Sequence, residues 1–182
     1  KLNEPYWQHV DWVIKKAAEK GIFIGLLPTW GDKWNRRGGA GPQIFNPETA
    51  KAYGKLIGTR YRDYNNIIWI LGGDRPVELE IQRQTVCAMA EGLREGDGGA
   101  HLMSYHPNGA SGSSLNFHNE TWLDFNMRQN GHSQSYTERY SMTYEDYKLI
   151  PVKPVIDGEP IYEDHPINFN PDQNGHSTAA DV

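Results

Sequence analysis

The sequence contains only one cysteine, Cys87, among its 182 residues. A single cysteine excludes an intrachain disulfide and a zinc site built from several cysteines. Because Cys87 follows Val86 in the apolar pattern of a predicted helix, we interpret it as a small core residue. Long hydrophobic runs are also missing. The longest, such as residues 67–71, are far shorter than the roughly 20 residues of a membrane span, so we expect a soluble chain.

The sequence also lacks an excess of basic residues. The formal net charge is -5, and no stripe of lysines and arginines of the kind that neutralises phosphates is present. We therefore expect no nucleic-acid partner. The sequence does contain 37% hydrophobic and 12% aromatic residues, which is enough for the packed core of one domain.

The two ends of the sequence lack the features of a complete protein. It begins at Lys1 without an initiator methionine or a targeting segment. It stops at Val182 after His-Ser-Thr-Ala-Ala-Asp, a pattern typical of a helix N-cap and first turn. We expect residues 1–182 to form a single, partial catalytic domain that is a segment of a longer protein.

Patterns typical of helices and strands alternate along the chain. The continuous apolar run of residues 22–27 predicts a strand that is buried on both faces. Alternation of this kind predicts right-handed crossovers and a parallel sheet. The predicted strands are residues 22–27, 67–71, 101–105, 123–127 and 152–156, and the predicted helices are residues 3–20, 46–64, 80–95 and 144–149.

The unusual polar and aromatic residues follow these strands rather than precede them. In a (β/α)8 barrel, the loops that follow the strands build the active site. A doubly wound open sheet is the main alternative, but it usually carries a glycine-rich phosphate turn, and Gly72-Gly73-Asp74 does not match G-x-G-x-x-G. We predict an α/β fold of the (β/α)8 TIM-barrel class. A full barrel needs eight strands, so the five predicted strands are a part of it.

Two carboxylates stand out at the ends of predicted strands. Asp74 follows a strand and two glycines that permit a tight turn, although capping or turn formation explains an aspartate there equally well. Glu159 repeats the arrangement in Asp157-Gly158-Glu159-Pro160. Glutamate is a poor turn former and is costly to bury unless it is used or paired, so a functional role is favoured. Two such carboxylates can act as acid/base and nucleophile in cleaving an acetal.

Aromatic and polar residues on the same loops suit a sugar substrate, because sugar rings stack on aromatic faces and their hydroxyl groups need hydrogen-bond partners. Each of these residues taken singly has a structural explanation, and the pattern depends on the whole set. The predicted substrate-binding residues are Trp30, Asp32, Trp34, Tyr105, His106, Asn126, Gln129, His132, Tyr162 and Glu163.

Two other kinds of enzyme are alternatives to the two-carboxylate reading. A metal-dependent barrel hydrolase is the main rival, because His106 and His132 both follow strands. The sequence has no H-E-x-x-H motif and no further ligands from the first and last strands, so we expect no metal and no cofactor. A serine or cysteine nucleophile is disfavoured because G-x-S-x-G is absent and Cys87 lies within a helix.

Three segments give the chain a family resemblance. Pro28-Thr29-Trp30-Gly31-Asp32-Lys33-Trp34, Ile68-Trp69-Ile70-Leu71-Gly72-Gly73-Asp74 and Asp157-Gly158-Glu159-Pro160-Ile161-Tyr162-Glu163 resemble the bacterial apiosidase-like glycoside hydrolases, which have a (β/α)8 catalytic barrel. The resemblance runs over nearly the whole chain. It implies that Asp74 ends strand four as acid/base and that Glu159 ends strand seven as nucleophile. The chain would then cover strands three to seven.

The resemblance also carries expectations about the reaction. It implies a retaining mechanism, a plant cell-wall (pectic) glycan as substrate and a secreted or periplasmic location, with apiose as one candidate sugar. An oligo- or polysaccharide is therefore the expected partner. A non-catalytic carbohydrate-binding barrel is the second hypothesis, but such a protein would have no need of both Asp74 and Glu159.

Overall fold

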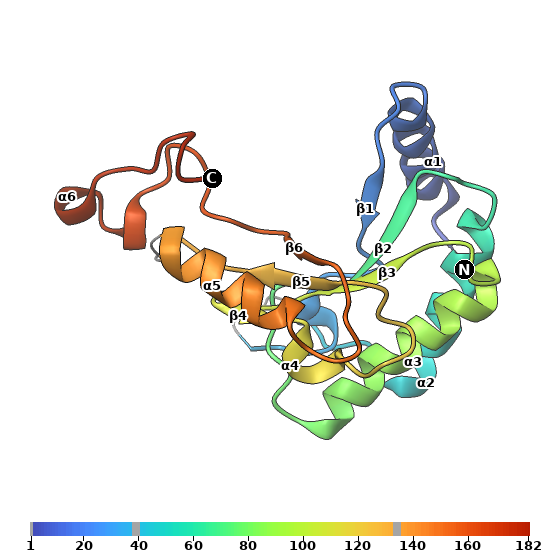
Figure 1. Ribbon diagram of the computed structural model, residues 1–182. Helices are drawn as coiled ribbons and strands as arrows, with labels where there is room; N and C mark the ends of the chain where they lie inside the picture. Colours follow the sequence, from blue (N-terminus) through green and yellow to red (C-terminus); the bar gives the residue numbers. More distant parts are fainter. Residues whose placement is uncertain (1, 38–40, 133–135) are drawn as a thin grey trace.

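The computed structural model describes residues 2–37, 41–132 and 136–182, and for residues 136–139 it describes the backbone alone (Figure 1). Its strands form two three-stranded sheets. The first is wholly parallel, in the order β1-β2-β3, and the second has the order β4-β5-β6, with β4 antiparallel and β6 parallel to β5. The strands are β1 (Ile24–Leu26), β2 (Ile67–Gly72), β3 (Met103–His106), β4 (Ser111–Gly112), β5 (Asn126–Gln129) and β6 (Val155–Asp157).

Helices α2, α3, α4 and α5 lie between strands, while α1 precedes β1 and α6 follows β6. Asn46 caps α2 by accepting a hydrogen bond from the Thr49 amide, and Gly98 ends α3 in the left-handed conformation. In the described part of the chain, no helix is long and apolar enough to cross a membrane. The helices are α1 (Glu4–Ala18), α2 (Pro47–Tyr61), α3 (Glu80–Asp97), α4 (Ser114–Phe117), α5 (Tyr136–Tyr147) and α6 (Pro171–Asn174), with 3-10 turns at Gly31–Lys33 and Ile167–Phe169.

The two sheets meet between β3 and β5. The Asp124 amide donates to the Met103 carbonyl at 2.9 Å, and Ser104 Oγ donates to the Phe125 carbonyl at 2.7 Å. Side by side, the parallel strands therefore run in the order β1, β2, β3, β5 and β6. The α/β fold with a parallel sheet agrees with the prediction, and within the described residues the strands form an open arrangement rather than a closed barrel.

The first predicted strand is less buried than its sequence suggests. Ile22 and Phe23 are 53% and 64% exposed, and β1 itself is only partly buried. The prediction of burial on both faces is wrong because β1 pairs with β2 alone among the described strands and so forms a sheet edge. An edge strand leaves apolar side chains accessible that a neighbouring strand would otherwise cover.

Strand β2 separates two apolar clusters. Alternate side chains of a strand point to opposite faces of the sheet. Trp69 and Leu71 pack with Ile57 and Leu93 of α2 and α3, and form the main core. Ile70 faces the other way and packs with Phe125, Met127, Leu27 and Ile68 in a smaller cluster.

Glycines bring α2 and α3 together, and the two helices lie side by side in Figure 1. A Cβ atom at Gly92 would lie 2.2 Å from the Lys51 carbonyl oxygen, and one at Gly96 would lie 2.4 Å from that of Lys55. Gly54 and Gly58 make the reciprocal contacts from α2, where a Cβ atom would lie 2.5 Å from a carbonyl oxygen of α3 at each position. The two backbones are therefore in direct contact.

A buried polar cluster fixes the amino-terminal end of β3. Asp97 Oδ2 lies 2.9 Å from His101 Nδ1 and accepts a hydrogen bond from Trp69 Nε1 at 2.9 Å. His101 Nε2 lies 2.6 Å from the Tyr64 carbonyl oxygen. Both ring nitrogens of His101 thus face oxygen atoms of the protein.

Candidate active site

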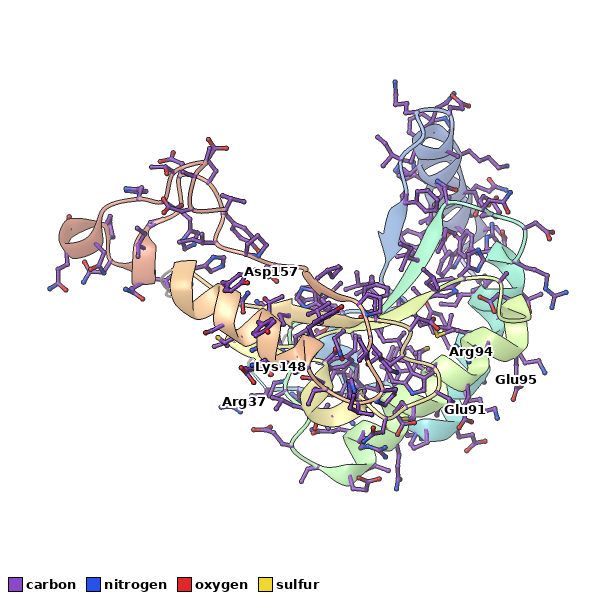
Figure 2. The ribbon with its side chains drawn as sticks, viewed as in Figure 1. Arg37, Glu91, Arg94, Glu95, Lys148 and Asp157 are labelled. Carbon is purple, nitrogen blue, oxygen red and sulfur yellow. The ribbon has the colours of Figure 1, made fainter. Side chains whose placement is uncertain are left out.

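The carboxyl ends of the parallel strands carry the candidate residues. Asp74 lies two residues after β2, and Glu159 lies two residues after β6. Asp157, labelled in Figure 2, ends β6 and accepts a hydrogen bond from Asn130 Nδ2 at 2.7 Å. His106 ends β3, and its Nε2 lies 2.9 Å from Glu159 Oε2. This contact joins the ends of β3 and β6 directly.

A turn with three consecutive positive φ angles presents Asp74. The φ angles of Gly72, Gly73 and Asp74 are 96°, 93° and 56°. A Cβ atom at Gly72 would lie 2.4 Å from the His106 carbonyl oxygen, and one at Gly73 would lie 2.7 Å from the Gly31 amide nitrogen. Glycine at both positions therefore lets the loop after β2 pack against the β1 loop and the end of β3.

Side chains from neighbouring segments hold this loop by its carbonyl groups. Trp34 Nε1 donates to the Gly72 carbonyl at 2.9 Å, and Tyr105 OH donates to the Arg75 carbonyl at 2.8 Å. Trp34 and Tyr105 are only 3% and 1% exposed. We predicted both as substrate-binding residues, and in the structure both are buried and support the Asp74 loop.

Replacing Trp34 by phenylalanine would test this support. The substitution keeps an aromatic ring in the core but removes the N–H group, which leaves the buried Gly72 carbonyl without this donor. We expect the free energy of unfolding to fall by about 1–3 kcal/mol. Urea unfolding measures the change, and exposed Trp12→Phe serves as the control, since Trp12 is 56% exposed. Equal stability of the two variants would contradict the supporting role.

Glu159 has a partner on each carboxylate oxygen. Tyr162 OH donates to Oε1 in a short contact, and His106 Nε2 faces Oε2. The hydrogen bond to Glu159, followed by burial and by the charges of Glu159 and Asp74, raises the pKa of Tyr162 to about 12. Tyr162 therefore keeps its proton at neutral pH and remains a donor.

The two carboxylates lie near the same side chains. The charges of Asp74 and Glu159 both act on Tyr162 and on His132. Burial and the adjacent His165 lower the pKa of His132, while the two carboxylates act in the opposite direction. Asp74 also contributes, after burial, to raising the pKa of Tyr105. The loops after β2, β5 and β6 thus converge on one site.

The remaining predicted binding residues occupy different places. Trp30 is 48% exposed, with its ring centroid 6.3 Å from that of His106, where a ligand at the site can reach it. Glu163 is exposed. Asp32 is buried and pairs with Lys33 Nζ at 2.8 Å. Gln129 is buried, and its Oε1 has no hydrogen-bond partner among the described residues, so this atom is free to accept one.

Asn126 has no exposed surface. Its side chain is fully buried, with Oδ1 accepting a hydrogen bond from Ser113 Oγ at 3.0 Å and Nδ2 lying 3.1 Å from His118 Nδ1. We predicted Asn126 as a substrate-binding residue, and in the structure it is buried and bonded within the protein. It ties β5 to the short α4 segment, because each of its polar ends is bonded within the protein.

Sequence reasoning missed an aromatic group around His132. The His165 ring stacks on His132 with centroids 4.2 Å apart, and Phe169 contacts His132 edge-on at 5.4 Å. Tyr162 completes the group at 4.5 Å from His132. The available signal was the position of His165 just after the Gly-Glu-Pro motif, but no predicted strand precedes it directly.

The histidines that suggested a metal site have other contacts. His106 faces Glu159, and His132 stacks on His165. Among the side chains that the structure describes, no group of three or more histidine, cysteine, aspartate or glutamate residues is arranged to hold a metal ion.

Comparison with known proteins places this geometry in context. Among curated proteins, no sequence matches the chain. A crystal structure of a glycoside hydrolase family 5 protein from Bacteroides vulgatus is similar, with 35% sequence identity and a TM-score of 0.84 over 97% of this chain. A second structure, of a glycoside hydrolase, shows 34% identity and a TM-score of 0.81 over 94% of the chain. The chain spans 38% and 40% of the lengths of these two proteins.

The family comparison covers the chain from end to end. Residues 1–182 match the catalytic domain of the apiosidase-like family. The matched region includes the Gly-Gly-Asp turn, the Gly-Glu-Pro segment and the strands that carry them. The chain therefore belongs to the apiosidase-like family.

Proposed function

We propose that this chain is part of a retaining glycoside hydrolase in which Glu159 is the nucleophile and Asp74 is the acid/base. The observation that carries the proposal is the placement of the two carboxylates on loops at one edge of the parallel strands, where both act on Tyr162 and His132. Glu159 is oriented on both oxygens, by His106 and Tyr162. Membership of the apiosidase-like family and the glycoside hydrolase neighbours support the same reaction.

The proposed reaction is a double displacement. Glu159 attacks the anomeric carbon and forms a glycosyl ester, while Asp74 gives its proton to the leaving oxygen as the glycosidic bond breaks. Asp74 then takes a proton from water, which attacks the same carbon and returns Glu159 to a carboxylate. This mechanism requires the two carboxyl groups to approach to about 5 to 5.5 Å.

We further propose the setting in which this reaction takes place. Residues 1–182 form one partial catalytic domain, equivalent to strands three to seven of a (β/α)8 barrel. The substrate is a plant cell-wall (pectic) oligo- or polysaccharide, and the protein is secreted or periplasmic. Trp30, exposed beside His106, offers a face on which a sugar ring can stack. These statements rest on the resemblance to the apiosidase-like family.

Hydrolysis of a panel of aryl glycosides and pectic oligosaccharides tests the proposal, with binding measured in parallel. Retention predicts that proton NMR of the first product detects the anomer of the substrate's own configuration. The inverted anomer would reject Glu159 as nucleophile and favour a general-base role. Binding without turnover of any panel member would favour a carbohydrate-binding protein over an enzyme.

A further inference from the structure

His106 has a defined partner on each ring nitrogen. Its Nδ1 lies 2.9 Å from the Pro107 carbonyl oxygen, and its Nε2 lies 2.9 Å from Glu159 Oε2. The side chains of His106 and Glu159 are only 12% and 16% exposed. Water therefore has little access to the pair, and the ring is held in one orientation.

These partners determine where the protons lie. A carbonyl oxygen accepts hydrogen bonds but cannot donate them, so His106 Nδ1 carries a hydrogen. A neutral ring would then turn the lone pair of Nε2 toward an ionised Glu159, and the two would repel. A contact of 2.9 Å consequently requires a proton between Nε2 and Oε2.

The second oxygen of Glu159 indicates which group holds that proton. Tyr162 donates to Oε1. Donors on both oxygens favour the ionised form of a carboxyl group. The proton between the pair then belongs to His106, and the contact is a charge-assisted hydrogen bond between an imidazolium and a carboxylate.

We propose that His106 is a positioning residue that stays protonated in the resting protein and holds Glu159 as an oriented carboxylate through Nε2. This role rests on the proposed function of Glu159 as nucleophile. His106 keeps its proton throughout: the bond from Glu159 to the anomeric carbon forms as the glycosidic bond breaks, and the leaving oxygen takes its proton from Asp74. When water later cleaves the ester, the imidazolium stabilises the carboxylate that returns.

Several groups surround this pair. Tyr162 lies on the same loop as Glu159, and the ring of Trp30 approaches His106 from the loop after β1. Asp74 and His132 belong to the loops after β2 and β5, and the charges of both carboxylates act on His132.

A measurement without substrate tests the protonation. Proton–nitrogen NMR of protein labelled with nitrogen-15 in its histidine rings reports the state of each ring nitrogen, and H106Q identifies the signals of His106. At pH 7.5 we expect two protonated nitrogens on His106 in the wild type and a single one in E159Q. His101, which also faces acceptors on both nitrogens, is the internal reference. A wild-type His106 with a bare Nε2 would overturn the proposal.

Kinetics then test the link to catalysis. The probe is the 2,4-dinitrophenyl glycoside of the sugar that the panel identifies, because this leaving group departs without help from Asp74. We expect H106Q, which keeps a neutral donor, to lower kcat/KM by about ten- to a hundredfold, and H106F to lower it further.

The controls separate this role from others. H9Q makes the same substitution on the exposed face of α1 and should leave kcat/KM unchanged. A wild-type kcat/KM in H106F would overturn the positioning role. If the wild type hydrolyses no glycoside while the NMR result is as expected, the proposed function fails and the ion pair alone stands.

Discussion

Glu159→Ala should reduce hydrolysis of the best panel substrate by at least about a thousandfold, as removal of a catalytic nucleophile commonly does. The variant keeps the loop but has no oxygen to attack the anomeric carbon. Added azide or formate fits the space that the side chain leaves and can attack in its place. We expect partial recovery of substrate cleavage with azide, and a glycosyl azide of inverted configuration as product, detected by mass spectrometry and NMR.

Asp74→Ala should give a different kinetic pattern at the same site. Loss of an acid/base group lowers rates by about 10²- to 10⁴-fold. With a 2,4-dinitrophenyl leaving group the first step should be nearly normal, and the glycosyl ester should accumulate. The control is Glu91→Ala on the outer side of α3, which is labelled in Figure 2 and lies in an exposed ion pair with Lys51. Near-normal turnover by Glu159→Ala would reject Glu159 as the nucleophile, whatever the result for Asp74→Ala.

Gly92→Ala should be the most damaging single change away from the site. The new methyl group would lie 2.2 Å from the Lys51 carbonyl oxygen and 2.9 Å from the Lys55 amide nitrogen, both in the backbone of α2. Neither atom can move unless the helices separate, and separation loosens the core beneath Trp69. We expect the free energy of unfolding to fall by about 3 kcal/mol, the upper end of the usual range for overpacking. Urea unfolding followed by circular dichroism measures this change.

Gln84→Ala is the matched control for this prediction. It introduces the same residue into the same helix at an exposed position, and should change the free energy of unfolding by less than about 0.5 kcal/mol. Alanine is the better helix former, so a propensity effect alone would make Gly92→Ala stabilising. A stability gain in Gly92→Ala would therefore contradict the close backbone contact between α2 and α3.

The sequence predicts the order of elements better than their limits. The apolar run of β2 is continuous, and its position was predicted within one residue. The strand predicted from residue 123 begins instead at Asn126, because Asp124 is used to accept a hydrogen bond from the Met103 amide at 2.7 Å. Helix α5 begins at Tyr136, earlier than the predicted start at residue 144. The prediction missed its first turns because they carry few apolar residues. The two-residue β4 lies in a segment predicted as a loop.

The sequence pattern predicts the carboxylates of the site better than the roles of its aromatic residues. A carboxylate after a buried strand is visible in the sequence, and the structure brings the loops of Asp74 and Glu159 to one edge. An aromatic residue on such a loop has two uses, since it can stack on a ligand or support the backbone. Trp30 is exposed, whereas Trp34 is buried and donates to Gly72. Spacing does not distinguish them, because the difference depends on which carbonyl group lies beside the indole nitrogen.

The positive φ of Asp74 has a consequence for the choice between the two acidic amino acids. A φ of 56° lies in the left-handed region, which aspartate and asparagine enter more readily than other residues with a Cβ atom. Glutamate at this position would have a more strained backbone and a side chain longer by one methylene group. The shape of the turn therefore favours aspartate, the shorter of the two acidic residues, at position 74. Glu159 does not have a positive φ, so its backbone accommodates the longer side chain of glutamate.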